Sequence, residues 1–220
     1  RQMCIRDSYR YVPFRVAAQD IEAFIRWCQR EGVGGLSVTI PHKQAVLPLL
    51  TQGEAAAQGI GACNTIVFSG EDRIGYNTDY RAAMECIGLG LAKIYEEPNP
   101  FEGRSALLLG AGGVSRAIGW GLTQRRVRVA VSSRNLNSAE RLAKEFGGRA
   151  VPWEERHSVQ PSILVNGTPI GMFPEMDETP FRKDNLDPRT LVFDTVYNPE
   201  QTLLIRQAKT VGCPVITGLN

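Results

Sequence analysis

The sequence predicts an α/β protein with two α/β domains, the second of them a Rossmann-like dinucleotide-binding domain. Apolar stretches of strand length alternate with stretches of helical periodicity through both halves of the chain. A polar, proline-rich segment at residues 96–100 separates these halves. Directly after it, the apolar run Ser105–Leu109 leads into the glycine-rich turn Gly110–Gly113 and then into a helix-like segment. This strand–turn–helix order is the context that a dinucleotide site needs.

The first half alternates helices and strands, each with its own local signal. Apolar residues spaced as on one helical face predict a helix over Ile21–Arg30. Glu31-Gly32 ends it, Pro41 ends the strand that follows, and the polar turn at residues 69–72 predicts a hairpin. The remaining elements expected here are strands over Gly35–Ile40, Ile60–Phe68 and Arg73–Asn77 and helices over Lys43–Leu50 and Asp79–Leu89.

The glycine-rich turn of the second half has the residues that a pyrophosphate site requires. Gly110 permits the tight turn, and Gly112 lets the backbone approach the phosphates. Gly113 and Ala117 keep the helix close to the strand, so that its free N–H groups face the ligand.

A second strand, Val127–Ser132, is followed by Ser133 and Arg134 where an NAD site usually carries an acidic residue for the ribose 2′-hydroxyl. A guanidinium suits a 2′-phosphate and gains little from a hydroxyl. The sequence therefore favours NADP over NAD. A solvated surface arginine on an unrelated α/β turn remains the alternative.

Composition narrows the class of protein. The 220 residues are 43% hydrophobic and 22% charged with a net charge of +2, as in an ordinary soluble globular protein. Lysine and arginine are scattered, so we expect neither a nucleic-acid face nor a membrane patch. Five widely spaced cysteines without a C-x-x-C pair predict reduced thiols in the cytoplasm, and two histidines are too few for a metal cluster.

Neither end of the chain has the pattern of a complete protein. The first eight residues have no apolar core of a signal peptide and no clear periodicity. The last eight, from Cys213, predict a strand that runs into a turn and leaves an α/β unit unfinished. We therefore expect a chain truncated at both ends.

Six motifs in register resemble those of the shikimate dehydrogenase family, over nearly the whole chain from about Tyr9. They are Ser37-Val-Thr-Ile-Pro-His-Lys43, Gly61-Ala-Cys-Asn-Thr65, Gly75-Tyr-Asn-Thr-Asp79, Gly110-Ala-Gly-Gly113, Asn166-Gly-Thr-Pro-Ile-Gly-Met172 and Asp194-Thr-Val-Tyr-Asn-Pro199. The resemblance implies NADPH-dependent reduction of 3-dehydroshikimate to shikimate, a step of chorismate and aromatic amino acid biosynthesis. It also implies a substrate-binding catalytic domain over residues 1–95, an NADP-binding domain over residues 101–220, and an active site in the cleft between them.

The resemblance also assigns roles to individual residues. It makes Lys43 the catalytic lysine and Asp79 its partner, and it places Thr39, Asn64 and Tyr197 at the substrate. The positions that it gives to the cofactor are Gly110, Ala111, Gly112, Gly113, Ser133, Arg134, Asn135, Met172 and Gly218.

This chain departs from the family pattern in several places. Of the Asn-Arg-Thr clamp on the adenosine, only the arginine is kept, and Ser138 stands about where a second basic residue is common. The paired serines that grip the substrate carboxylate and the later substrate-binding glutamine have no counterpart, as expected of a truncated chain.

Several alternatives stay open. Without the resemblance, the favoured interpretation is that Lys43 only begins a solvated helix and that Asp79 only caps one. His42 is expected to be structural and His157 to be solvated. A quinate/shikimate dehydrogenase using NAD and a non-catalytic sensor module are the other functions. A homodimer and fusion to another enzyme of the same pathway are also open.

Overall fold

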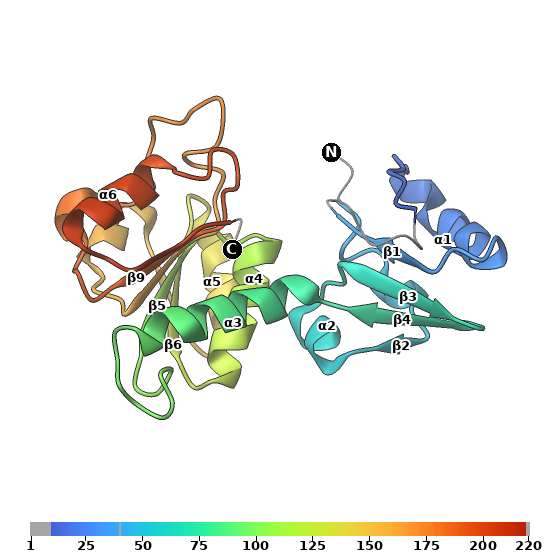
Figure 1. Cartoon of the computed structure of the whole chain (residues 1–220), viewed down its shortest axis with the longest axis horizontal. Helices are drawn as coiled ribbons and strands as arrows, with labels where there is room; N and C mark the ends of the chain where they lie inside the picture. Colours follow the sequence, from blue (N-terminus) through green and yellow to red (C-terminus); the bar gives the residue numbers. More distant parts are fainter. Residues whose placement is uncertain (1–9, 40, 219–220) are drawn as a thin grey trace. The chain divides into compact units, whose positions relative to one another are not determined.

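The computed structural model describes residues 10–39 and 41–218. Contacts divide the chain into two compact units, Arg1–Tyr76 and Asn77–Asn220 (Figure 1). This division comes earlier in the chain than the expected boundary near residue 95. The reason is that the long helix α3, Thr78–Ala92, packs against the sheet of the second unit.

The first unit contains a mixed sheet whose four strands have the order β1-β3-β4-β2. The β1–β3 and β3–β4 pairs are antiparallel, and β2 runs parallel to β4. In chain order the elements of this unit are η1 (Ala18–Asp20), α1 (Ile21–Arg30), β1 (Gly35–Ser37), η2 (Leu47–Leu49), β2 (Gln52–Gly53), α2 (Ala55–Ile60), β3 (Thr65–Ser69) and β4 (Asp72–Tyr76).

Two predictions for this unit are confirmed, and both depended on local signals. Helix α1 has the predicted bounds and buries Ile25 and Cys28 on its apolar face. The hairpin lies at residues 69–72, where Ser69 pairs with Asp72 and Gly70 has φ +59°, a conformation that favours glycine.

Two other predictions are wrong. The segment expected to be a helix over Lys43–Leu50 forms turns and the short 3₁₀-helix η2. Pro48 has no N–H to donate within a helix, and its ring clashes with the preceding turn. The strand expected to begin at Ile60 begins at Thr65 instead, because α2 occupies the alanine-rich stretch and ends at Gly61 in the left-handed conformation (φ +68°).

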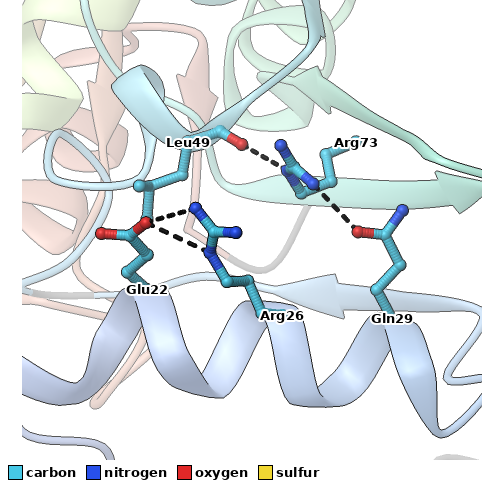
Figure 2. A network of polar contacts seen from close by, with 5 residues as sticks. All are labelled: Glu22, Arg26, Gln29, Leu49 and Arg73. Carbon is cyan, nitrogen blue, oxygen red and sulfur yellow. Dashed lines mark hydrogen bonds and ion pairs between the residues drawn. The ribbon is translucent and has the colours of Figure 1, made fainter.

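A polar network joins α1 to η2 and the hairpin (Figure 2). The Arg73 guanidinium of β4 donates from Nε to the Leu49 carbonyl (2.5 Å) and from Nη1 to Gln29 Oε1 (3.0 Å). Gln29 Nε2 in turn donates to the Gly70 carbonyl at 2.9 Å. The exposed pair of Arg26 and Glu22 within α1 contributes little, as is usual for surface ion pairs. The network fixes the end of the segment that carries Lys43.

The second unit is built on a six-stranded sheet of order β10-β9-β8-β5-β6-β7, with every neighbouring pair parallel. The chain moves outward from β5 in one direction, returns to β8 and moves outward in the other. This is the doubly wound order of a Rossmann fold, and its switch point lies between β5 and β8. The strands are β5 (Ser105–Leu109), β6 (Arg128–Ser132), β7 (Arg149–Val151), β8 (Ile163–Asn166), β9 (Leu191–Asp194) and β10 (Val215–Ile216).

Helices cover both faces of this sheet (Figure 1). Ala106 and Leu108 of β5 face α3, α4 and α5, whereas Leu107 and Leu109 face α6 and the segment around Phe181. The helical elements of this unit, besides α3, are α4 (Gly113–Gln124), α5 (Leu136–Glu145), η3 (Trp153–Ser158), η4 (Lys183–Asn185) and α6 (Leu203–Val211). Within the described ranges, no helix combines the length and the apolar character that crossing a membrane would require.

Candidate functional site

The glycine-rich turn forms an open cradle at the carboxyl end of β5. Gly110 has φ +96°, and its N–H donates to the Ser132 carbonyl at 2.7 Å, which holds the turn beside the end of β6. Gly112 is the N-cap of α4 and provides no side chain to its first N–H groups. A Cβ on Gly112 or Gly113 would meet no atom within 4 Å. The free N–H groups therefore face open space, and this arrangement fits a pyrophosphate.

The turn that follows β8 lies against this cradle at the switch point. The Gly167 N–H donates to the Leu109 carbonyl at 2.8 Å. A Cβ on Gly167 would lie 2.2 Å from Ser115 Oγ, so only glycine lets the two turns approach so closely. Ser115 is fully buried in the first turn of α4, and its Oγ has no hydrogen-bond partner among the described residues.

Gly167→Ala is expected to lower the free energy of unfolding by about 1–3 kcal/mol, because the new methyl group overpacks this contact. Adding Ser115→Ala removes the clashing oxygen and should restore most of the loss. Urea unfolding of the two single variants and the double variant measures this coupling. A Gly167→Ala variant as stable as the wild type would contradict the close approach.

Arg134 follows the carboxyl end of β6 and is exposed. Within the described part of the chain, its guanidinium has no hydrogen bond or ion pair. Asn135 is the N-cap of α5, and its side-chain oxygen accepts a hydrogen bond from the Ser138 N–H at 3.1 Å. The arginine is therefore available to a ligand, whereas the Asn135 oxygen is already engaged.

The loops after β8, β9 and β10 carry the other predicted residues of this unit. Met172 is 38% exposed and Tyr197 is 64% exposed. Gly218 lies against the loop of Tyr197, since a Cβ there would come within 2.8 Å of the Thr195 and Val196 carbonyl oxygens. The structure thus brings these three predicted positions to the same edge of the sheet as the glycine cradle.

A buried polar network at the base of these loops was not predicted from the sequence. Asp194, at the end of β9, is 0% exposed and accepts hydrogen bonds from Asn166 and Thr202. Burial raises the pKa of its carboxyl group, and its hydrogen bonds oppose that rise. The sequence did contain a signal that could have predicted this network: each of two buried strands ends in a polar residue, Asn166 in β8 and Asp194 in β9.

In the first unit, backbone hydrogen bonds bring together the segments of three predicted residues. The Val38 N–H, next to Thr39, donates to the Asn64 carbonyl at 2.7 Å. The Cys63 N–H donates to the Lys43 carbonyl at 2.8 Å. Asn64 is 7% exposed, while Lys43 is half-buried and Thr39 is exposed. Thr39, Lys43 and Asn64 are therefore carried by adjoining segments of this unit.

Both alternative interpretations of the lysine and the aspartate fail. Lys43 lies in a turn and begins no helix. The N-cap of α3 is Asn77, whose side-chain oxygen accepts from the Tyr80 N–H at 3.1 Å, and Asp79 lies in the first turn of that helix. A pairing of Lys43 with Asp79 stays a prediction.

The two histidines make local contacts. His42 Nε2 lies 2.9 Å from the Val16 carbonyl oxygen, as expected of a structural residue. His157, expected to be solvated, instead packs on Phe181 at 5.0 Å between ring centroids, and its Nδ1 accepts from the Arg182 N–H. Burial lowers its pKa, and the charges of Arg156 and Arg182 act in the same direction. Among the described residues, no cluster of His, Cys, Asp or Glu could hold a metal ion.

The chain is similar to known proteins over most of its length. Residues 6–66 match the family model of the shikimate dehydrogenase substrate binding domain. A protein of Desulforamulus reducens named shikimate dehydrogenase (NADP(+)) is 37% identical over an alignment of 226 positions, which covers 96% of this chain and 75% of the relative.

Two solved structures have the same architecture. Shikimate 5-dehydrogenase of Thermus thermophilus, in complex with NADP(H) and shikimate, superimposes with a TM-score of 0.78 at 32% identity and covers 93% of this chain and 74% of its own. Quinate dehydrogenase of Corynebacterium glutamicum, in complex with NAD, superimposes with a TM-score of 0.80 at 30% identity and covers 94% of this chain and 74% of its own. The glycine cradle, the doubly wound sheet and the identity to the Desulforamulus protein together show that this chain belongs to the shikimate dehydrogenase family.

Proposed function

We propose that this chain is an NADP-dependent oxidoreductase that reduces 3-dehydroshikimate to shikimate in chorismate and aromatic amino acid biosynthesis. The observation that carries the proposal is Arg134, exposed and without a partner among the described residues, directly after the strand that adjoins the glycine cradle. A dehydrogenase built for NAD usually has an acidic residue at this position.

The residues around the cradle fit the cofactor. Backbone N–H groups of residues 110–113 would hold the pyrophosphate, with Ala111 and the first turn of α4 behind it. Arg134, with Ser133 beside it, would bind the 2′-phosphate through a charge-assisted hydrogen bond. Asn135 would contribute only as a donor, through its side-chain NH₂ group, because its side-chain oxygen already caps α5. Met172 and Gly218 would lie by the nicotinamide.

The reaction requires a hydride at the carbonyl carbon and a proton at the carbonyl oxygen. NADPH, when bound, supplies the hydride. The Lys43 ammonium polarises the carbonyl, gives its proton to the oxygen as charge develops there, and regains a proton from solvent. Asp79 would orient the ammonium through the attraction of opposite charges. Thr39 and Asn64 would hold the substrate's hydroxyl groups, and Tyr197 would also bind the substrate.

A quinate/shikimate dehydrogenase using NAD is the second candidate. The fold does not separate the two, since the quinate dehydrogenase superimposes as well as the shikimate enzyme. Arg134 favours the first candidate, and the presence of both Lys43 and Asp79 argues against a sensor module without catalysis. A cytoplasmic location, a homodimer and a fused partner enzyme stay predictions.

Steady-state rates with shikimate and quinate, each with NADP⁺ and NAD⁺, test the proposal on the gene product that contains this chain. We expect the highest kcat/KM for shikimate with NADP⁺. A preference for quinate with NAD⁺ would support the second candidate instead. Binding of shikimate without turnover by any of the four pairs would support the sensor.

A further inference from the structure

We propose that Asp194 is a positioning residue for the nicotinamide half of the cofactor, because its buried carboxylate locks together the two loops that carry Met172 and Tyr197. The proposal rests on the proposed function, and it goes beyond it by assigning a role to a residue that contacts neither substrate nor cofactor. It concerns only the second unit, in which every residue of the network lies.

The Asp194 carboxylate joins three parts of this unit. Its Oδ1 accepts from Asn166 Nδ2, at the end of β8, at 3.0 Å, and from the Val196 N–H of its own loop at 3.1 Å. Its Oδ2 accepts from Thr202 Oγ1, the N-cap of α6, at 2.6 Å. Thr202 Oγ1 in turn accepts from the Ile205 N–H at 3.2 Å. The carboxylate thus ties two strand ends to the start of the next helix.

The Asn166 side chain, which is bonded to Asp194, also forms hydrogen bonds within the loop that leads to Met172. Its Oδ1 accepts from the Thr168 N–H at 3.0 Å and from Thr168 Oγ1 at 2.6 Å, and its Nδ2 also donates to the Ile170 carbonyl at 3.2 Å. The contact of Nδ2 with a carboxylate settles which end of the amide is the donor. The turn of residues 166–170 is therefore folded around one side chain that Asp194 orients.

The two loops are also joined at their bases and farther out. Thr195 donates to the Asn166 carbonyl from both its N–H (3.1 Å) and its Oγ1 (2.8 Å). The Phe173 N–H donates to the Asn198 carbonyl at 3.0 Å. Phe173 follows Met172 and Asn198 follows Tyr197, so the outer bond holds the two exposed side chains at a fixed spacing.

A carboxylate suits this position better than an amide would. All three groups that bond to it are donors, and its partners are all neutral. An asparagine at 194 would turn an NH₂ group toward one of those donors and leave it unsatisfied. A fully satisfied buried network makes the surrounding loops rigid in one arrangement. That rigidity is what an orienting site requires.

The network lies under one half of the dinucleotide site only. In a doubly wound sheet the ribose that carries the 2′-group lies by the strand after the glycine turn, which is β6 here. The other mononucleotide crosses the switch point toward β8 and β9, above Asn166 and Asp194. Loosening the network should therefore disturb the nicotinamide end and spare the adenosine end.

Thr202→Val and Asp194→Asn test the proposal, with Thr202→Ser as the matched control that keeps the hydroxyl. Titrations with NADPH and with adenosine 2′,5′-bisphosphate, which has no nicotinamide, separate the two ends of the site. We expect each test variant to lower kcat for shikimate oxidation and to weaken NADPH by about 10-fold, while the bisphosphate binds as to the wild type. Thr202→Ser should stay close to the wild type in both.

Equal weakening of both ligands in a test variant would show a general loss of structure and overturn the proposal. So would unchanged kcat and NADPH affinity in folded variants. If Thr202→Val does not fold, Asp194→Asn decides, since it keeps the volume and leaves the cap of α6 in place. A wild-type protein that neither binds NADPH nor oxidises shikimate would refute the proposed function and the positioning role together. An active wild-type protein whose variants are unaffected would refute the positioning role alone.

Discussion

Replacing Lys43 with alanine is expected to lower kcat for shikimate oxidation by about 10²–10⁴-fold, the usual contribution of a general acid or base. In this direction the Lys43 amine accepts the hydroxyl proton as the hydride leaves the carbon, so its loss acts on the transition state and KM should change much less than kcat. Steady-state kinetics across the pH range measure both constants. Lys93→Ala, at the exposed carboxyl end of α3, is the matched control and should leave both unchanged.

The same experiment extends to Asp79. Asp79→Asn keeps the shape of the side chain but removes the charge proposed to orient Lys43, so turnover should also fall. The double variant should be little worse than the worse single variant, because residues that act as one unit are not additive. A Lys43→Ala enzyme with nearly wild-type kcat would show that Lys43 contributes to binding only. His42 or water would then be the next candidate for the group that exchanges the proton.

Replacing Arg134 with alanine is expected to weaken NADPH by about 1.5–3 kcal/mol, or roughly 10- to 150-fold, and to leave NADH almost unchanged. Only NADPH has the 2′-phosphate that a guanidinium binds through a charge-assisted hydrogen bond. Fluorescence titration with each cofactor gives the two affinities.

Arg128→Ala is the matched control for this prediction. Arg128 is also exposed, but it begins β6, whereas Arg134 follows the opposite, carboxyl end of that strand. Its loss should leave both affinities unchanged. Equal losses of NADPH and NADH on removal of Arg134 would refute its assignment to the 2′-phosphate.

Features that depend on neighbouring residues were predictable from the sequence. Strand β5 has the predicted bounds, Ser105–Leu109, since five apolar or small residues precede a glycine turn. Helix α1 and the hairpin at residues 69–72 follow from periodicity and turn chemistry in the same way. Arg134 could be singled out because its place is counted from the glycine turn along one strand–turn–helix unit.

Local signals were insufficient where two sequence signals point to different structures for the same segment. Lys43–Leu50 has helical spacing, yet Pro48 and the packing of residues 41–50 on the first sheet leave only η2. Asp79 is a good cap by residue type, but Asn77 takes that place two residues earlier. Both outcomes, the missing helix and the choice of N-cap, depend on how the segment packs in the folded protein.

The sequence by itself determined the α/β class, the glycine cradle and the family to which the chain belongs, and it predicts a preference for a 2′-phosphate. Only the tertiary structure decided how the loops at the carboxyl edge are held. Asn166 and Asp194 are 28 residues apart and Asp194 and Thr202 are 8 apart, and their bonds form only because β8 and β9 are neighbours in the sheet. Gly167 and Ser115 meet for the same reason, since the turn after β8 lies against the start of α4. Such contacts arise from strand order, which no local pattern of residues contains.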